Sequence, residues 1–290
     1  MNTTTTAPTL ETSAMLVQLS ISQWTARKRD GAATRRVARD YNASETAGNY
    51  NKALLPKDTA LAAIHTKTGE IRNWYYENTL PWGLDGSRLL PANNFFAFSQ
   101  QMSTYRSEWE GLVADFLAAY DQAKRNAVAL LGNLYDPHDY PSADEVERKF
   151  SIDLAVFPVP STDFRVQVGQ EALAALAADV ERRVSDAQAA AMADLWQRLY
   201  DVVEKLADKL ADPKGIFRDT LVQNARDLCA LLPRLNMTGD AKLEGMRQSV
   251  EKMLAGVSPE TLRRDETVRA DTADAAADIM RQMGAFMGGL

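Results

Sequence analysis

Positively charged side chains gather in one short stretch near the start of the sequence. The segment Arg27–Tyr41, RKRDGAATRRVARDY, holds six Arg and Lys residues, although the whole chain of 290 residues has a formal net charge of −6. Cations at this density suit a polyanion, because each one can neutralise a phosphate of a nucleic-acid backbone. The alternative interpretation is a solvated helix face whose arginines pair with carboxylates on neighbouring helices.

Charge is also distributed unevenly over the whole chain. Residues 1–76 contain ten Lys and Arg residues against six Asp and Glu residues, which is a formal charge of +4 and leaves −10 for residues 77–290. Such asymmetry favours a polyanionic partner for the basic part. The acidic remainder would oppose indiscriminate adhesion to nucleic acid.

Aromatic residues follow the basic stretch and extend the candidate site. Trp74, Tyr75 and Tyr76 are consecutive, and consecutive residues of a helix point about 100° apart, so the three cannot all face a core. Trp82 falls in a predicted loop. Exposed rings stack on the bases of a single strand while cations meet its phosphates, although Trp and Tyr also anchor protein interfaces. The expected nucleic-acid interface comprises Arg27, Lys28, Arg35, Arg36, Arg39, Lys52, Trp74, Tyr75, Tyr76, Trp82 and Arg88.

The sequence lacks the usual patterns of catalytic and metal sites. It contains neither a Gly-rich phosphate loop ending in Lys-Ser/Thr nor a dinucleotide-binding fingerprint. Its two histidines, His65 and His138, and its one cysteine, Cys229, cannot build a structural zinc site. No spacing suggests a nucleophile with a partner base. We therefore expect a protein without enzymatic activity, with no catalytic residues, no metal and no cofactor.

Short elements are predicted in the first third of the chain and around residue 155. Residues 15–22 alternate apolar and polar side chains, which predicts a strand, and residues 150–160 predict a second strand that could pair with it. Residues 22–30 and 32–41 predict two short helices broken near Gly31. A further helix is expected from Pro56 to the Pro- and Gly-rich loop over 78–94.

Two long apolar stripes determine the predicted architecture. Apolar residues step by threes and fours from Phe95 to Leu134 and again from Leu173 to Leu210, which predicts two helices about 60 Å long. Neither helix can bury its stripe alone, so we expect them to pair antiparallel, with shorter helices alongside. The predicted fold is mostly α: an elongated helical bundle with two long antiparallel helices and a small β element.

Residues 1–14 have neither the basic nor the apolar region of a signal peptide and are expected to form a disordered arm. Residues 15–290 are expected to form a single elongated domain, with a basic part over 15–90 and a long-helix bundle over 91–290. No apolar run is long enough for a membrane helix. A single cysteine fits a reducing cytoplasm.

Several segments resemble a known group of proteins. LSISQWTARKRD, NYNKALLP, YYENTLPW, GSRLLPANNFF, FRDTLVQNARDL and LLPRLN are similar to segments of a functionally uncharacterised family from tailed phages and prophages, over nearly the whole chain after the first dozen residues. More distantly, the chain resembles the single-stranded DNA-binding transcription cofactors of N4-like phages. The resemblance implies a protein of the infected bacterial cytoplasm or of the virion, and it carries no catalytic residues.

Two functions therefore stay open. The first is a non-enzymatic phage protein that binds single-stranded DNA, or RNA, in replication, recombination or transcription. Its other expected partners are further copies of itself and a polymerase or another replication protein, with no membrane involved. The alternative is an assembly, structural or adaptor protein that oligomerises through its long helices and presents the arginines to an acidic partner.

Overall fold

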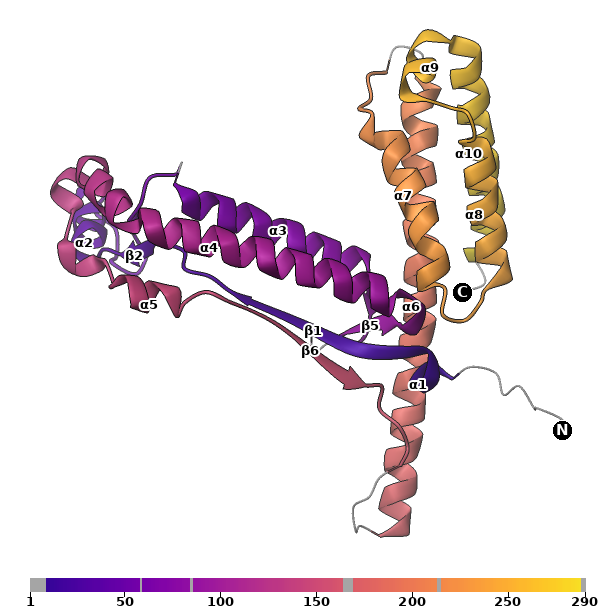
Figure 1. Cartoon of the computed structure of the whole chain (residues 1–290), viewed down its shortest axis with the longest axis horizontal. Helices are drawn as coiled ribbons and strands as arrows, with labels where there is room; N and C mark the ends of the chain where they lie inside the picture. Colours follow the sequence, from indigo (N-terminus) through magenta and orange to yellow (C-terminus); the bar gives the residue numbers. More distant parts are fainter. Residues whose placement is uncertain (1–8, 58, 84–85, 164–168, 213–214, 288–290) are drawn as a thin grey trace. The chain divides into compact units, whose positions relative to one another are not determined.

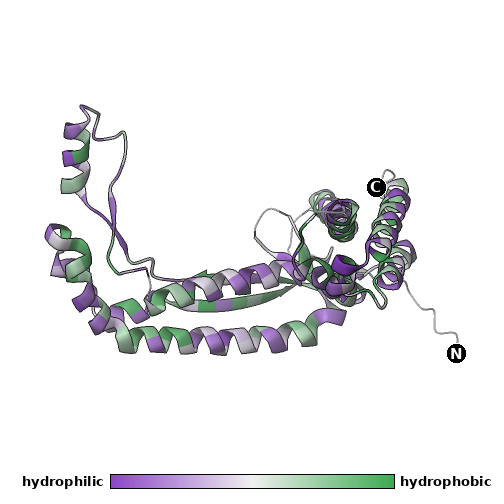
Figure 2. Ribbon diagram, turned by 90° about the horizontal axis from the view of Figure 1, so that it is seen from above, coloured by the Kyte–Doolittle hydropathy of each residue, from purple (hydrophilic) through white to green (hydrophobic). Residues whose placement is uncertain are grey.

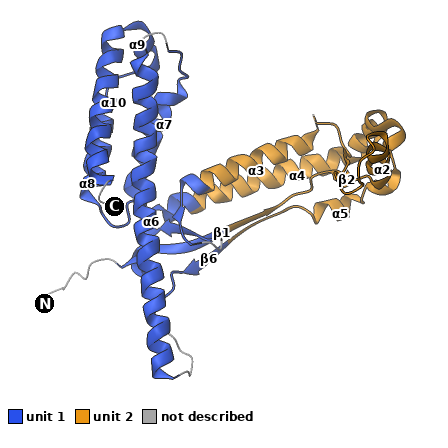
Figure 3. Cartoon of the chain, turned by 180° about the vertical axis from the view of Figure 1, so that it is seen from behind, with its two compact units in different colours: residues 1–18, 76–98, 155–290 blue, residues 19–75, 99–154 orange. Residues whose placement is uncertain are grey.

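The computed structural model describes residues 9–57, 59–83, 86–163, 169–212 and 215–287. Helices account for 68% of the chain, about twice the average for globular proteins, which confirms the mostly α prediction. Figure 3 shows that the chain divides into two compact units. Unit 1 comprises residues 1–18, 76–98 and 155–290, and unit 2 comprises residues 19–75 and 99–154. The expected single domain over 15–290 stays a prediction.

Figure 1 labels most of the elements. The α-helices of the described residues are α1 (Leu10–Ser13), α2 (Gly31–Asp40), α3 (Ala60–Glu77), α4 (Phe95–Leu131), α5 (Ala143–Glu147), α6 (Gln170–Ala211), α7 (Thr220–Leu235), α8 (Ala241–Met253), α9 (Pro259–Arg264) and α10 (Glu266–Met287). The strands are β1 (Ala14–Ser22), β2 (Arg27–Arg29), β3 (Asn51–Ala53), β4 (Leu80–Pro81), β5 (Arg88–Pro91) and β6 (Ser151–Pro158). Short 3₁₀-helices are η1 (Ala92–Asn94), η2 (Gly132–Leu134) and η3 (Pro137–Asp139).

A four-stranded sheet has the order β4-β5-β1-β6, and β2 and β3 form a separate two-stranded ribbon. In the larger sheet β1 runs antiparallel to β5, with Leu16 opposite Leu89. The strands predicted over 15–22 and 150–160 are thus confirmed as neighbours. Strands β4 and β5 lie inside the segment predicted as a loop. The prediction missed them because each strand is short and ends in a proline, and prolines and glycines indicate turns.

Unit 2 has an aromatic core between α3 and α4. Trp109 of α4 donates its indole N–H to Thr68 Oγ1 of α3 over 2.9 Å, and farther along the same helices Trp74 meets Tyr105 edge to face. Trp24, which follows β1, lies against Phe116 and Tyr120 of α4. Figure 2 shows that the helices carry both hydrophobic and hydrophilic residues, as amphipathic packing requires.

Unit 1 has its core around α6. The apolar stripe of this helix from Ala191 to Leu210 is buried and packs in one cluster with residues of α7, α8 and α10. Arg269 of α10 closes the end of α6 by donating to the carbonyl oxygens of Lys209 and Leu210. Cys229 of α7 is buried in the same core, and burial raises the pKa of its thiol to about 11.

The two long helices are confirmed as helices, with 37 residues in α4 and 42 in α6. The residues named above for each core come from its own unit, so pairing of α4 with α6 is not needed to bury either stripe. That pairing and the elongated shape stay predictions. In the first turns of α6, Leu176 is 43% exposed, and Leu173, Val180 and Val184 are only half-buried.

Two local expectations are corrected. The helix predicted over 22–30 is instead the strand β2, because residues 27–29 pair with residues 51–53 across the ribbon. The arm predicted as disordered over 1–14 is ordered in its last part, where Leu10 of α1 is buried in the unit 1 core. Residues 1–8 lie outside the described residues. Within the described part of the chain, no helix is both long and apolar enough to cross a membrane.

Candidate nucleic-acid interface

The β2–β3 ribbon of unit 2 sorts its cations onto two faces. Side chains alternate between the faces of a strand, so Lys28 lies on the opposite face from Arg27 and Arg29. Lys28 stands directly across from Lys52 in the antiparallel register. One face of the ribbon therefore presents two lysines, and the other presents two arginines.

The lysine face binds a carboxylate. Lys52 Nζ lies 2.6 Å from Asp139 Oδ2 and donates to the carbonyl oxygen of Leu134 over 2.7 Å. Lys28 Nζ lies 2.6 Å from Asp139 Oδ1, and Asp30 is a second, longer partner of Lys52 at 3.4 Å. Lys52 is 6% exposed, so it cannot reach a phosphate, and its predicted place in the interface is corrected to a structural one.

The electrostatics of this cluster favour its charged forms. Burial alone would lower the pKa of the Lys52 ammonium, but its hydrogen bond to Asp139 and the charges of Asp139 and Asp30 outweigh burial and raise it. Burial alone would raise the pKa of the Asp139 carboxyl, but Lys28 and Lys52 outweigh burial and hold that pKa below its ordinary value. The cluster thus fastens the ribbon to the turn that contains η3.

Helix α2 follows strand β2 after the single residue Asp30. Asp30 caps it by accepting a hydrogen bond from the N–H of Ala33 over 2.8 Å, and Thr34 and Ala38 are its buried positions. This orientation leaves Arg35, Arg36 and Arg39 exposed. None of these three, nor Arg27 or Arg29, forms an ion pair with any residue that the structure describes.

A small hollow lies on another flank of the same helix. It has a volume of about 290 Å³, is open to solvent, and is bordered by the loop that follows α2. Tyr41 at its rim is 81% exposed, and Tyr50 and Val37 are exposed as well. The lining comprises Thr34, Val37, Ala38, Tyr41, Ala43, Ser44, Ala47, Gly48, Asn49 and Tyr50.

The aromatic residues predicted on α3 contribute less than expected. Tyr75 is 3% exposed and belongs to the core, so it cannot stack on a base, and its predicted role is corrected. Trp74 is half-buried against Tyr105.

Three other predicted contacts, Tyr76, Trp82 and Arg88, belong to unit 1. Trp82 is half-buried and packs on the unit 1 core. Tyr76 is exposed, with the Arg88 guanidinium 4.9 Å from its ring centre. Arg88 also donates from Nε to Thr79 Oγ1 over 2.6 Å and from Nη2 to the carbonyl oxygen of Thr79 over 3.0 Å. These hydrogen bonds engage its guanidinium group within unit 1.

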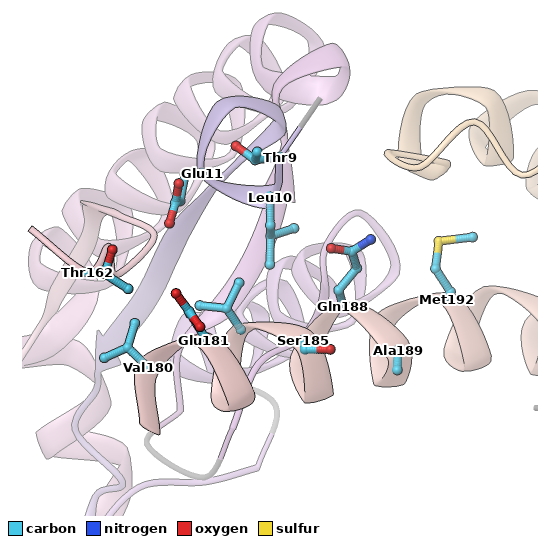
Figure 4. A pocket seen from close by; sticks show the side chains of 11 residues that line it. Thr9, Leu10, Glu11, Thr162, Val180, Glu181, Ser185, Gln188, Ala189 and Met192 are labelled. Atoms are coloured by element: carbon cyan, nitrogen blue, oxygen red, sulfur yellow. The ribbon is translucent and has the colours of Figure 1, made fainter. Parts of the chain in front are cut away.

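Unit 1 also contains a larger hollow, of about 500 Å³, between α1 and the first half of α6 (Figure 4). Its charged lining residues are the two acids Glu11 and Glu181, without a basic residue. Such a lining repels phosphate, so this hollow does not extend the candidate interface.

The structure assembles no metal-binding cluster from the His, Cys, Asp and Glu residues it describes. His65 is half-buried and its Nε2 lies 3.0 Å from the carbonyl oxygen of Trp24, while His138 is exposed and bonds to Asp136. The two histidines therefore stand in separate local hydrogen bonds.

No family model, curated protein or solved structure matches this chain. The phage resemblance of the sequence segments stays a prediction.

The sequence analysis did not include three exposed residues that lie beside the predicted arginines and belong to the candidate interface. Arg29 lies on the same ribbon face as Arg27, which only the strand pairing reveals. Tyr41 follows Val37 by four residues, a spacing that places both on one flank of a helix, so this signal was present in the sequence. Tyr50 reaches the same hollow through the fold of the loop, which no local pattern indicates.

Proposed function

We propose that this chain is a non-enzymatic phage protein that binds single-stranded DNA or RNA through the arginine face of unit 2. The arginine face comprises Arg27, Arg29, Arg35, Arg36 and Arg39. The observation that carries the proposal is that these five cations are exposed and have no ion-pair partner among the described residues. Processes that expose single strands in an infected bacterium, namely replication, recombination and transcription, are its proposed setting.

A second arginine pair in the same chain shows what a solvated helix face looks like. Arg182 and Arg183 are consecutive and exposed on α6, as Arg35 and Arg36 are on α2, and both bind Asp179. On α2, Asp40 stands four residues after Arg36 and forms no ion pair with it in the structure. The contrast favours an external anion as the partner of the α2 arginines.

The aromatic side chains beside these arginines favour a single strand over a duplex. Tyr41 and Tyr50 are exposed within the same part of unit 2, and rings of this kind stack on unpaired bases. The bases of a duplex already stack on one another and are not offered to such rings. Sequence preference is expected to be weak, because every base has a face that can stack.

The test compares the two arginine pairs directly. Fluorescence anisotropy would follow a labelled single strand across a salt series, with wild-type protein, the Arg35→Gln/Arg36→Gln variant and the matched Arg182→Gln/Arg183→Gln variant. Each cation removed from a phosphate makes the salt slope shallower by about 0.7 for single strands, so the slope of the α2 variant should be shallower by about 1.4. Its affinity should fall for every base sequence alike, whereas the α6 variant should bind as the wild type does.

Equal binding by both variants would overturn the proposal. A lower unfolding midpoint or a changed oligomeric mass in the α2 variant would also count against it, because these arginines would then be structural. Poly(rU) measured in parallel with poly(dT) distinguishes RNA from DNA as the bound strand.

The alternative function, assembly through the long helices, has one observation in its favour. The first turns of α6 leave Leu176 exposed and three neighbouring apolar residues half-buried within unit 1. Replacing Leu176 and Val180 with Glu should lower the mass measured by light scattering if this stripe joins copies of the chain. An unchanged mass would contradict assembly through α6 and leave a polymerase or another replication protein as the remaining proposed protein partner.

A further inference from the structure

We propose that the hollow beside α2 takes one unstacked nucleobase of the strand held by the arginine face. This inference rests on the proposed function and deepens it, since it names the part of the ligand that enters and the residues that receive it. The hollow is formed wholly within unit 2 by one flank of α2 and the loop over residues 41–50.

Helix α2 presents the arginines and the wall of the hollow on its two opposite flanks. Thr34 and Ala38 mark the buried side, and each successive residue turns by about 100°. Arg35 and Arg39 therefore lie on one flank, and Arg36 lies opposite the buried side. Val37 and Tyr41 lie on the other flank, where they form one wall of the hollow. A strand that crosses the helix near Arg36 has phosphates on one flank and a base on the other.

The chemistry of the hollow favours the base over the phosphate. Val37, Ala38, Ala43 and Ala47 line it with apolar surface, which would desolvate a charged group without compensation. Asp40 is exposed on the same flank of α2 as Val37 and adds a negative charge that repels phosphate. A neutral aromatic ring is the part of a nucleotide that meets neither penalty.

The loop supplies the opposite wall and holds it in place. Its start is fixed by the N–H of Ala43, which donates to the carbonyl oxygen of Ala38 over 2.8 Å. Its end is fixed by the N–H of Tyr50, which donates to Thr34 Oγ1 over 3.0 Å. Both tyrosines can offer a ring face to a base, while Ser44 and Asn49 supply polar groups for its edge.

Three changes test the proposal: removing the Tyr41 ring, filling the hollow with a larger side chain, and removing the bases from the oligonucleotide. Tyr41→Ala should weaken binding of a poly(dT) oligonucleotide by about 5- to 150-fold with an unchanged salt slope, the range that corresponds to losing one stacked base. Tyr41→Phe keeps the ring and should bind as the wild type does. Ala47→Leu should reproduce the loss by filling the hollow. Because Tyr41 and Ala47 are exposed, neither change should move the unfolding midpoint.

An oligonucleotide made of abasic residues completes the design. Wild-type protein and Tyr41→Ala should bind it equally, because it offers phosphates and no base. If Arg35→Gln/Arg36→Gln weakens binding of poly(dT) and Tyr41→Ala does not, the base site is wrong and the arginine interface stands. If neither variant changes binding, the proposed function itself fails.

Discussion

Two sets of cations lie within 26 residues of unit 2, and in the β2–β3 ribbon they occupy opposite faces. Lys28 and Lys52 point from the β2–β3 ribbon onto Asp139, where they are bonded and partly or fully buried. Arg27 and Arg29 lie on the other face of the ribbon and are exposed, as are the arginines of α2, the next helix in the chain. The difference shows that cations adjacent in sequence can have different environments, because strand alternation places Lys28 against Asp139 and leaves Arg27 and Arg29 exposed on the other face of the ribbon.

The largest effect should come from breaking the buried lysine. Lys52→Met removes the buried partner of the Asp139 carboxylate and leaves it with the half-exposed Lys28 alone, and breaking a buried ion pair typically costs about 3–5 kcal/mol of unfolding free energy. Chemical denaturation followed by circular dichroism measures it. Lys57→Met, at an exposed position of the same unit, is the matched control and should stay within about 0.5 kcal/mol of wild type. Equal midpoints for the two variants would contradict a structural role for Lys52.

Acid should lower the unfolding free energy through the Asp139 cluster, by less than Lys52→Met does. The folded-state pKa of Asp139 is lowered despite its burial, by Lys28 and Lys52, so the stability it contributes is present above its ordinary value near pH 4. That contribution is lost as the pH falls through the lower folded-state pKa. Asp139→Asn should therefore show a smaller drop in unfolding free energy over this acid range than wild type. Parallel acid profiles would show that the carboxylate contributes nothing through its charge.

The half-exposed lysine should matter less than the buried one. Lys28 has half of its side-chain surface in water, so solvent screens its pair with Asp139, and Lys28→Met should cost at most about 1 kcal/mol. Denaturation of Lys28→Met beside Lys52→Met gives the ranking. If Lys28→Met destabilises the protein as much as Lys52→Met does, burial does not determine how much each lysine contributes to stability.

The smallest effect on stability should appear on the arginine face. Arg27→Gln/Arg29→Gln should leave the unfolding free energy within about 0.5 kcal/mol, because neither arginine has an ion-pair partner among the described residues. The same variant should make the salt slope for poly(dT) shallower by about 1.4. A stability loss without a change in slope would reverse the assignment of the two faces.

The sequence predicted the elements with strong periodicity and missed those set by distant partners. The stripes from Phe95 and Leu173 predicted α4 and α6 to within a few residues at each end. Strand β2 was predicted as helix, because three basic residues have no local strand pattern. Its conformation depends on pairing with Asn51–Ala53, more than twenty residues later.

Only part of the candidate site was predictable: the arginines of α2 were, whereas Arg29 and Tyr50 depend on strand pairing and on the fold of a loop. Exposure of Arg35, Arg36 and Arg39 follows from the helical spacing of Thr34 and Ala38, which local sequence contains. Tyr75 was predicted to bind because it stands between Trp74 and Tyr76. It shares a helix face with Ile64, Thr68 and Ile71 and is buried with them. Tyr50 could not be assigned, since its place at the hollow depends on how the loop folds back onto α2.

The buried thiol of Cys229 provides a probe of how often the core of unit 1 opens. It is the only cysteine in the chain, so a thiol-specific reagent added to the native protein can label one position alone. Burial in the core of α6, α7, α8 and α10 protects the thiol and, by raising its pKa to about 11, keeps it protonated near neutral pH. The rate of labelling therefore reports how often that core opens. A variant that destabilises unit 1 should be labelled faster, whereas a variant that destabilises unit 2 alone should not.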